Sequence, residues 1–279
     1  MKKLIVLLLA SFSFATIINI PDDYSTIQEG IDASVNGDTV LVQAGTYFEH
    51  LSWSDKTIAL IGTDRDSVVI DGETIRRGID IGTWEYSRSN DRIDYNQIEN
   101  LTVQNCAGQG LFIGHRNGQV KSCYFNNNDN DNSGGGGICA RFSYTTIANS
   151  IFENNHAESG GGINYQYSSG SVDNCIVLNN SALRSGGGIK FYDSDVTISN
   201  LIIEDNLCLY GGTSEGGGIN ASHGSNVTVQ NCLVINNASS FPHSGNFWLQ
   251  SNTNLNLTNS TIIGGGTNVR DGGVLSIEN

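Results

Sequence analysis

A run of three glycines followed by isoleucine returns at near-regular intervals and constrains the fold more than any other feature of this 279-residue chain. The four copies end at Ile138, Ile163, Ile189 and Ile219. Each is followed by an asparagine-bounded element, which starts at Asn149, Asn174, Asn200 and Asn231, so the spacings are 25, 26 and 31 residues. Weaker copies at 122–128 and 259–265 bring the visible turns to about seven. A period of this length excludes a heptad coiled coil and a propeller blade.

The apolar residues within each copy form short runs, such as Ile176–Leu178, separated by Gly, Asn and Ser. Such runs are too brief for a helix of ordinary length and fit several short strands per copy. A period near 25 with three strands is typical of a right-handed parallel β-helix, in which each coil pairs only with its neighbours. We therefore predict an all-β, single-stranded right-handed parallel β-helix.

The glycines and the asparagines each have a structural interpretation. The glycines are expected in a turn that needs left-handed backbone angles or a close approach between coils, and the following isoleucine is expected to point inward. The last asparagine of each second element is expected to form an amide ladder from coil to coil. These residues are Asn155, Asn180, Asn206 and Asn237. Sugar binding by the same asparagines is the alternative.

The N-terminus predicts export and a cap. Residues 1–15 combine Lys2 and Lys3, an apolar stretch and a small-residue ending, which is the pattern of a secretory signal peptide. No later stretch is long and apolar enough to span a membrane, so we expect a secreted or outer-surface protein. We expect a cap and first coil over 16–62 and β-helix coils over 63–279, with an open or truncated C-terminal end.

A short amphipathic helix is predicted over Asp23–Asp32, with Ile27 and Ile31 on one face and Ser25 as its N-cap. This helix would cover the N-terminal end of the solenoid. The first strands are expected at Thr39–Val42, Ile58–Ile61 and Val68–Ile70.

The chain is acidic, with 28 Asp and Glu against 14 Lys and Arg. This balance argues against nucleic acid and anionic membranes as partners. It also disfavours strongly acidic polysaccharides, which need a basic track or bridging calcium. Neutral glycans or Ca²⁺-assisted contacts fit the overall charge better.

The six cysteines suggest disulfides in a secreted chain, but their positions argue otherwise. Cys123, Cys175 and Cys232 share one repeat slot and lie two coils apart, beyond the usual Cα limit of about 7 Å for a disulfide. We predict free buried thiols there. The pairing of Cys106, Cys139 and Cys208 stays open.

Two stretches resemble known families. Ile20–Gln28, Asn36–Val42 and Gly45–Glu49 resemble the opening of pectin-lyase-fold proteins, including pectin methylesterases, which carry a Gly-x-Tyr-x-Glu motif. The glycine-isoleucine copies and Phe152–Asn155 resemble the repeats of polymorphic outer membrane proteins, which are bacterial surface adhesins. The resemblances imply a pectin-lyase-like solenoid, a fold that hosts lyases, hydrolases, esterases and binders alike.

The catalytic motifs of these enzymes are mostly missing. The aspartate and arginine motifs of pectin methylesterases do not occur, and Gly114–Arg116 is only a short echo of a polygalacturonase motif. A pectate lyase needs an arginine or lysine base beside aspartate-bound calcium. Arg141 and Lys190 are the candidate bases, and Asp129 and Asp131 are the candidate calcium ligands.

The best candidate binding surface is the outer face of the strand that follows the glycines. If the isoleucines point inward, the residues one and three positions later point outward. The binding candidates are Arg141, Asn164, Gln166, Lys190, Tyr192, Asn220 and Trp248. Amides, aromatics and two cations suit hydrogen bonding and stacking with a sugar chain. An ordinary solvated face is the alternative.

We therefore expect a binding or adhesion module that recognises an extracellular glycan or a surface protein. A calcium-dependent polysaccharide lyase using Arg141 or Lys190 is the first alternative, and it predicts a deep cleft with carboxylates near these cations. A structural spacer is the second alternative, and it predicts no site. The binding module predicts a shallow strip with exposed aromatics.

Overall fold

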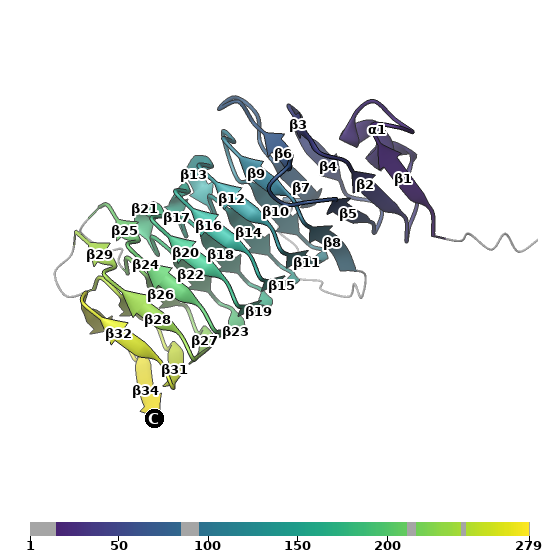
Figure 1. The fold of residues 1–279 in the computed structure, drawn as a ribbon. Helices are drawn as coiled ribbons and strands as arrows, with labels where there is room; N and C mark the ends of the chain where they lie inside the picture. Colours follow the sequence, from purple (N-terminus) through teal and green to yellow (C-terminus); the bar gives the residue numbers. More distant parts are fainter. Residues whose placement is uncertain (1–14, 85–94, 211–215, 241–243, 279) are drawn as a thin grey trace, which may run out of the picture.

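The computed structural model describes residues 15–84, 95–210, 216–240 and 244–278. These residues wind into an elongated right-handed parallel β-helix (Figure 1). Helix α1 (Ile27–Ala33) lies at one end, beside the first strand, and the C-terminus lies at the other. The predicted fold class is confirmed. The predicted signal peptide lies almost entirely outside the described residues.

Four parallel sheets run along the solenoid. Sheet A contains, in spatial order, β1 (Ile17–Ile20), β2 (Thr39–Val42), β5 (Ala59–Gly62), β8 (Tyr95–Glu99), β11 (Asn117–Lys121), β15 (Tyr144–Ala148), β19 (Ser169–Asp173), β23 (Asp195–Ser199), β27 (Asn226–Gln230), β31 (Asn254–Thr258) and β34 (Val274–Glu278). Sheet B contains β3 (Gly45–Tyr47), β6 (Val68–Asp71), β9 (Thr102–Gln104), β12 (Tyr124–Asn126), β16 (Ile151–Glu153), β20 (Ile176–Leu178), β24 (Ile202–Glu204), β28 (Leu233–Ile235) and β32 (Thr261–Ile263). Sheet C contains β4 (Leu51–Trp53), β7 (Ile79–Gly82), β10 (Leu111–Gly114), β14 (Ile138–Arg141), β18 (Ile163–Gln166), β22 (Ile189–Tyr192), β26 (Ile219–Ser222), β30 (Phe247–Leu249) and β33 (Thr267–Val269). Sheet D contains β13 (Asp129–Gly134), β17 (His156–Ser159), β21 (Ser181–Ser185), β25 (Leu207–Cys208) and β29 (Ala238–Ser239).

The number of turns exceeds the expected seven. Sheets B and C each hold nine strands, so the solenoid has about nine turns. The repeat pattern does not reveal the early turns because they fill the interior without a glycine run: Leu51 and Ile79 lie in register with Ile138, through Leu111. The central coils also carry a fourth strand, in sheet D, where we expected three per coil.

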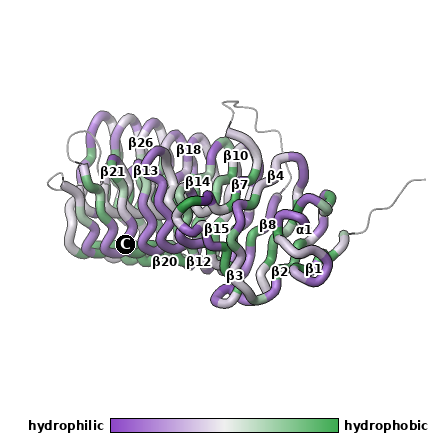
Figure 2. The backbone as a smooth tube through the Cα atoms, turned by 90° about the horizontal axis from the view of Figure 1, so that it is seen from above, coloured by the Kyte–Doolittle hydropathy of each residue, from purple (hydrophilic) through white to green (hydrophobic). Residues whose placement is uncertain are grey.

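The glycine runs form the turn from sheet D to sheet C. The first glycine of each run has a left-handed backbone, with φ of +78° at Gly135 and +64° at Gly160. A Cβ on the second glycine would strike backbone, since on Gly161 it would lie 2.2 Å from the carbonyl oxygen of Ser181. The isoleucine after each run is fully buried in the interior core. Both expectations for this motif are confirmed, and Figure 2 shows hydrophobic segments recurring along the coils.

The predicted asparagine ladder is confirmed. Asn155, Asn180, Asn206 and Asn237 are at most 1% exposed. Each side-chain amide donates to the side-chain oxygen of the next, for example from Nδ2 of Asn155 to Oδ1 of Asn180 at 2.9 Å. The ladder extends to Asn128 before the four and Asn246 after them. Because these amides are satisfied by the coils themselves, their role is structural.

The N-terminal helix is shorter than predicted, and its cap differs. Thr26 is the N-cap and forms a capping box with Glu29, whereas Ser25 Oγ donates to the Glu29 carboxylate. Ser25 was therefore the wrong cap residue. The carboxylate of Glu49 accepts from the backbone N–H groups of Ile27 and Gln28 at 3.0 Å each. Glu49 of the Gly-x-Tyr-x-Glu motif thus fastens the helix to the first coils.

None of the six cysteines forms a disulfide, and all six are buried. Burial raises the pKa of the Cys123 and Cys175 thiols to about 12, so both remain protonated. The shared slot behaves as a stacking position, because Ser150, one coil after Cys123, donates its backbone N–H to Cys175 Sγ at 3.4 Å. The prediction of free thiols at Cys123, Cys175 and Cys232 is confirmed, and Cys106, Cys139 and Cys208 form no disulfide either.

Candidate functional site

A groove of about 420 Å³ lies between the outer face of sheet C and the adjoining edge of sheet D. Its sheet C floor contains Arg141, Gln166, Lys190, Tyr192, Asn220, Ser222 and Gln250, the last of these just after β30. Its sheet D wall contains Ser133, Gly134, Glu158, Ser159, Arg184 and Ser185. Tyr167 and His223 stand in the turns after sheet C.

The glycine turns create this groove. A Cβ on Gly160 would lie 2.8 Å from the Cβ of Asn164, and one on Gly186 would lie 3.1 Å from the Cβ of Lys190. The turn therefore folds sheet D back over the residues that follow each isoleucine. Strand alternation does point those residues out of the interior core, but the adjoining sheet then covers most of them.

The expected open strip is wrong for four of the five residues that directly follow the inward-pointing Ile or Phe; the fifth, Lys190, is half-buried. Cys139 is 1% exposed, Asn164 0%, Asn220 3% and Trp248 2%. Arg270 covers Trp248 at 4.9 Å from the ring centroid, and Trp248 Nε1 donates to Gln250 Oε1 at 2.9 Å. Asn164 and Trp248 do not line the groove, whereas the other five binding candidates do.

The groove is locally cationic although the chain is acidic. Arg141, Arg184 and Lys190 line it, and Glu158 is the one carboxylate among the described lining residues. Arg184 Nε lies 3.1 Å from the carboxylate of Glu158. The lysine and two arginines leave a positive balance in a chain of formal net charge −14.

The proton affinity of Lys190 is strongly altered by its surroundings in the groove. Burial disfavours its ammonium form and lowers its pKa to about 8, although the negative charge of Glu158 acts in the opposite direction. Its Nζ donates to Ser159 Oγ at 3.2 Å and lies 5.9 Å from the Tyr192 ring centroid. A lysine in this state is a usable base at mildly alkaline pH.

A ladder of aromatic rings runs along one edge of the groove. The rings of Phe142 and Tyr167 stack at 4.8 Å, Tyr167 meets Tyr192 edge-on at 5.2 Å, and Tyr192 stacks on His223 at 4.1 Å. His115 continues the ladder by stacking on Phe142 at 4.8 Å. Only Tyr192 was among our candidates. The missed signal is an aromatic or histidine directly after the sheet C strand in four of five successive coils, from β10 to β26.

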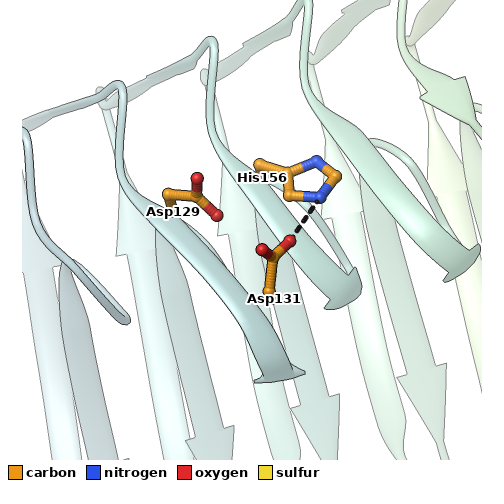
Figure 3. A group of neighbouring side chains, drawn as sticks. All are labelled: Asp129, Asp131 and His156. Carbon is orange, nitrogen blue, oxygen red and sulfur yellow. Dashed lines mark ion pairs between the residues drawn. The ribbon is translucent and has the colours of Figure 1, made fainter.

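The calcium candidates Asp129 and Asp131 lie in strand β13 and not in a loop. Their carboxylates and the ring of His156 bring ligand atoms within 4.8 Å of one another (Figure 3). His156 Nε2 lies 3.0 Å from Asp131, and its Nδ1 lies 2.7 Å from Ser181 Oγ. An imidazole nitrogen with two carboxylates suits a divalent transition metal better than Ca²⁺, which prefers oxygen ligands.

Sequence reasoning also missed the sheet D wall, including Glu158 and Arg184. The available signal is weak: small side chains alternate with polar ones between the asparagine pair and the glycines. Ala157, Ala182 and Cys208 are the buried members of that alternation. The polar members differ from coil to coil, so the repeat does not identify them.

A family model described as a right-handed β-helix region matches residues 94–279. The chain belongs to the right-handed β-helix family. No curated protein matches it. The part of the chain described by the structure contains no helix long and apolar enough to cross a membrane.

Among solved structures, this β-helix protein is similar to pectate lyase Pel9A, with a TM-score of 0.57 and 14% identity over 96% of this chain and 80% of the lyase. The A-module of mannuronan C-5 epimerase AlgE4 from Azotobacter vinelandii aligns at a TM-score of 0.31 and 17% identity, over 92% of this chain and 94% of the module. At these identities the lyase shows a shared fold, while the epimerase alignment is too loose to support any argument.

Proposed function

We propose that this protein is a secreted or surface-attached binding module that holds an acidic polysaccharide along the groove. The observation that carries the proposal is the concentration of Arg141, Arg184 and Lys190 in one groove of a strongly acidic chain. Overall charge favoured neutral glycans, but a ligand responds to the local field. A spacer has no need of such a site.

The shape of the groove suits an extended polymer. Arg141, Gln166, Tyr192 and Ser222 occupy equivalent positions on four consecutive strands. At roughly 4.8 Å per strand, these positions span about 14 Å along the solenoid. Arginines bind carboxylates or sulfates in a bidentate manner, and the aromatic ladder offers faces and edges for sugar rings.

The test is binding of polygalacturonate and of a neutral glucan to the mature chain by calorimetry. We expect binding of the acidic polymer, weakened by salt, and an affinity loss of about tenfold in Arg141→Gln, equivalent to about 1.4 kcal/mol. Arg65→Gln, in the loop before β6, is the matched control and should bind as wild type. Equal affinity for the neutral glucan would refute the proposal.

A polysaccharide lyase is the second candidate, and Lys190 is the observation that favours it. β-Elimination requires a base, and the lowered pKa of about 8 makes Lys190 a better choice than Arg141. The fold shared with a pectate lyase is consistent with this chemistry. The test follows unsaturated product by absorbance with and without Ca²⁺. Product that disappears in Lys190→Met and persists in Lys121→Met would establish the lyase.

A further inference from the structure

We propose that Ser159 and Lys190 form a nucleophile and base pair that hydrolyses carboxylic esters, such as acetyl groups, on the glycan in the groove. The choice of substrate rests on the proposed glycan binding, whereas the pair itself rests on geometry. No other step of the proposed function uses Ser159.

Three side chains form a connected chain of hydrogen bonds in the groove wall. Ser159 Oγ lies 3.2 Å from Lys190 Nζ and 3.1 Å from Ser185 Oγ. All three residues line the groove, yet Ser159 and Ser185 are only 8% and 6% exposed. A nucleophile within hydrogen-bond reach of a base, itself held by a third group, is the arrangement that activates serine in hydrolases.

The surroundings of Lys190 suit a base. Its neighbours in register are Asn164 and Asn220, which are uncharged. Burial is the main cause that lowers its pKa to about 8; Glu158 and Cys208 act to raise the pKa, and Arg184 acts to lower it. At mildly alkaline pH a substantial fraction of Lys190 therefore carries a lone pair that can accept the Ser159 proton.

The repeat alone does not account for this pair. Ser159 and Ser185 occupy the same position before their glycine runs, where the preceding coil carries Gly134, so a serine recurs there in two successive coils. The residue after each isoleucine is Cys139, Asn164, Lys190 or Asn220, so an amine occurs in one coil of the four. The lysine reaches back one coil to Ser159, which makes the pair specific to this point of the groove.

The chemistry balances with water as the only co-reactant. Neutral Lys190 takes the Ser159 hydroxyl proton while Oγ attacks the ester carbonyl carbon. The C–O bond of the leaving alcohol then breaks, and the alkoxide takes that proton from Lys190. Lys190 next accepts a proton from water, the hydroxide attacks the acyl carbon, and Ser159 leaves and regains the proton.

The test treats the mature chain with a fluorophosphonate probe and maps the adduct by mass spectrometry, and it measures acetate release from acetylated polygalacturonate. We expect one adduct, on Ser159, and acetate release that rises with pH through about 8, following deprotonation of Lys190. Ser159→Ala and Lys190→Met should each lower release by about 10²- to 10⁴-fold. Ser171→Ala and Lys121→Met, on sheet A, should leave release unchanged.

The outcomes separate this proposal from glycan binding. Calorimetric binding of polygalacturonate without an adduct on Ser159 and without acetate release would overturn the esterase and leave the binding module intact. An adduct on Ser159 with hydrolysis of a small ester, but no polysaccharide binding, would support the pair and refute the glycan as its substrate. Urea unfolding of Ser159→Ala checks that any loss of activity is not a loss of fold.

Discussion

Asn180 and Asn164 are both fully buried, yet they are held in opposite ways. The Asn180 side chain accepts from the backbone N–H and Nδ2 of Asn155, and it donates to Phe152 O and Asn206 Oδ1. Neither polar atom of the Asn164 amide has a hydrogen-bond partner among the residues that the structure describes. The first amide completes the coil, whereas the second is buried at a free-energy cost.

This difference indicates which positions of a solenoid stabilise the fold and which do not. A position that recurs in every coil with its partners, such as the asparagine ladder, is required by coil stacking. A buried polar group without partners is tolerated where another demand outweighs stability. Asn164 lies between Cys139 and Lys190, under the groove wall. We therefore expect substitutions in the two regions to differ in sign or size.

The largest effect is expected from Asn180→Leu. Leucine has a similar size but cannot bond, so the Asn155 N–H and the Phe152 carbonyl lose this amide in the interior. We expect a loss of about 3–4 kcal/mol in the free energy of unfolding. Urea titration followed by circular dichroism measures it. A loss below about 1 kcal/mol would mean that the ladder contributes little.

The second largest effect is expected in the glycine turn between sheet D and sheet C. Gly161→Ala places a Cβ 2.2 Å from the Ser181 carbonyl oxygen, so the two coils must move apart. We expect this to lower the free energy of unfolding by about 2–3 kcal/mol. Gly37→Ala is the matched control, since its Cβ meets nothing within 4 Å and only the left-handed backbone, φ +93°, opposes it. That strain costs about 1 kcal/mol. Equal losses would show that close approach is not the constraint.

Raising the pH should lower the affinity of the groove for an acidic glycan and reduce the cost that Lys190 imposes on the stability of the fold. Acidic glycan affinity should fall as pH passes about 8, where Lys190 loses its charge. Because its folded-state pKa lies below the ordinary 10.5, the unfolded chain binds this proton more tightly, and Lys190 destabilises the fold less as pH rises from about 8 toward 10.5. Ionisation of the buried thiols at high pH has the opposite effect on stability. Wild type and Lys190→Met are therefore compared at each pH, with glycan affinity measured by calorimetry and the free energy of unfolding by urea titration. Parallel pH profiles for both proteins would contradict the assignment.

The smallest change is expected from Asn164→Leu. Replacing an unpartnered amide by an apolar group of similar size should alter the free energy of unfolding by less than about 1 kcal/mol, in either direction. The same urea titration serves as the measurement, with Asn180→Leu as the matched comparison. A loss as large as that of Asn180→Leu would show that Asn164 also supports the coil.

The sequence predicted those features that recur from coil to coil. Ile163, the glycine turns and the asparagine ladder were predictable because every coil imposes the same constraint on them. Trp248 was misplaced because strand alternation gives the direction of a side chain but not which other side chain, here Arg270, covers it. Glu158 and Arg184 were missed because the sheet D strands that carry them, β17 and β21, have no strong apolar pattern, and their polar residues differ between coils. The groove is lined by residues that differ from coil to coil, so the repeat pattern does not reveal it.

Because each coil pairs only with its neighbours, each coil adds a fixed length to the groove. A segment such as 155–179 contains one complete turn, so duplicating or deleting it lengthens or shortens the groove by one strand spacing and leaves the pairing pattern of the other coils unchanged. The length of the groove therefore changes in whole steps of one strand spacing.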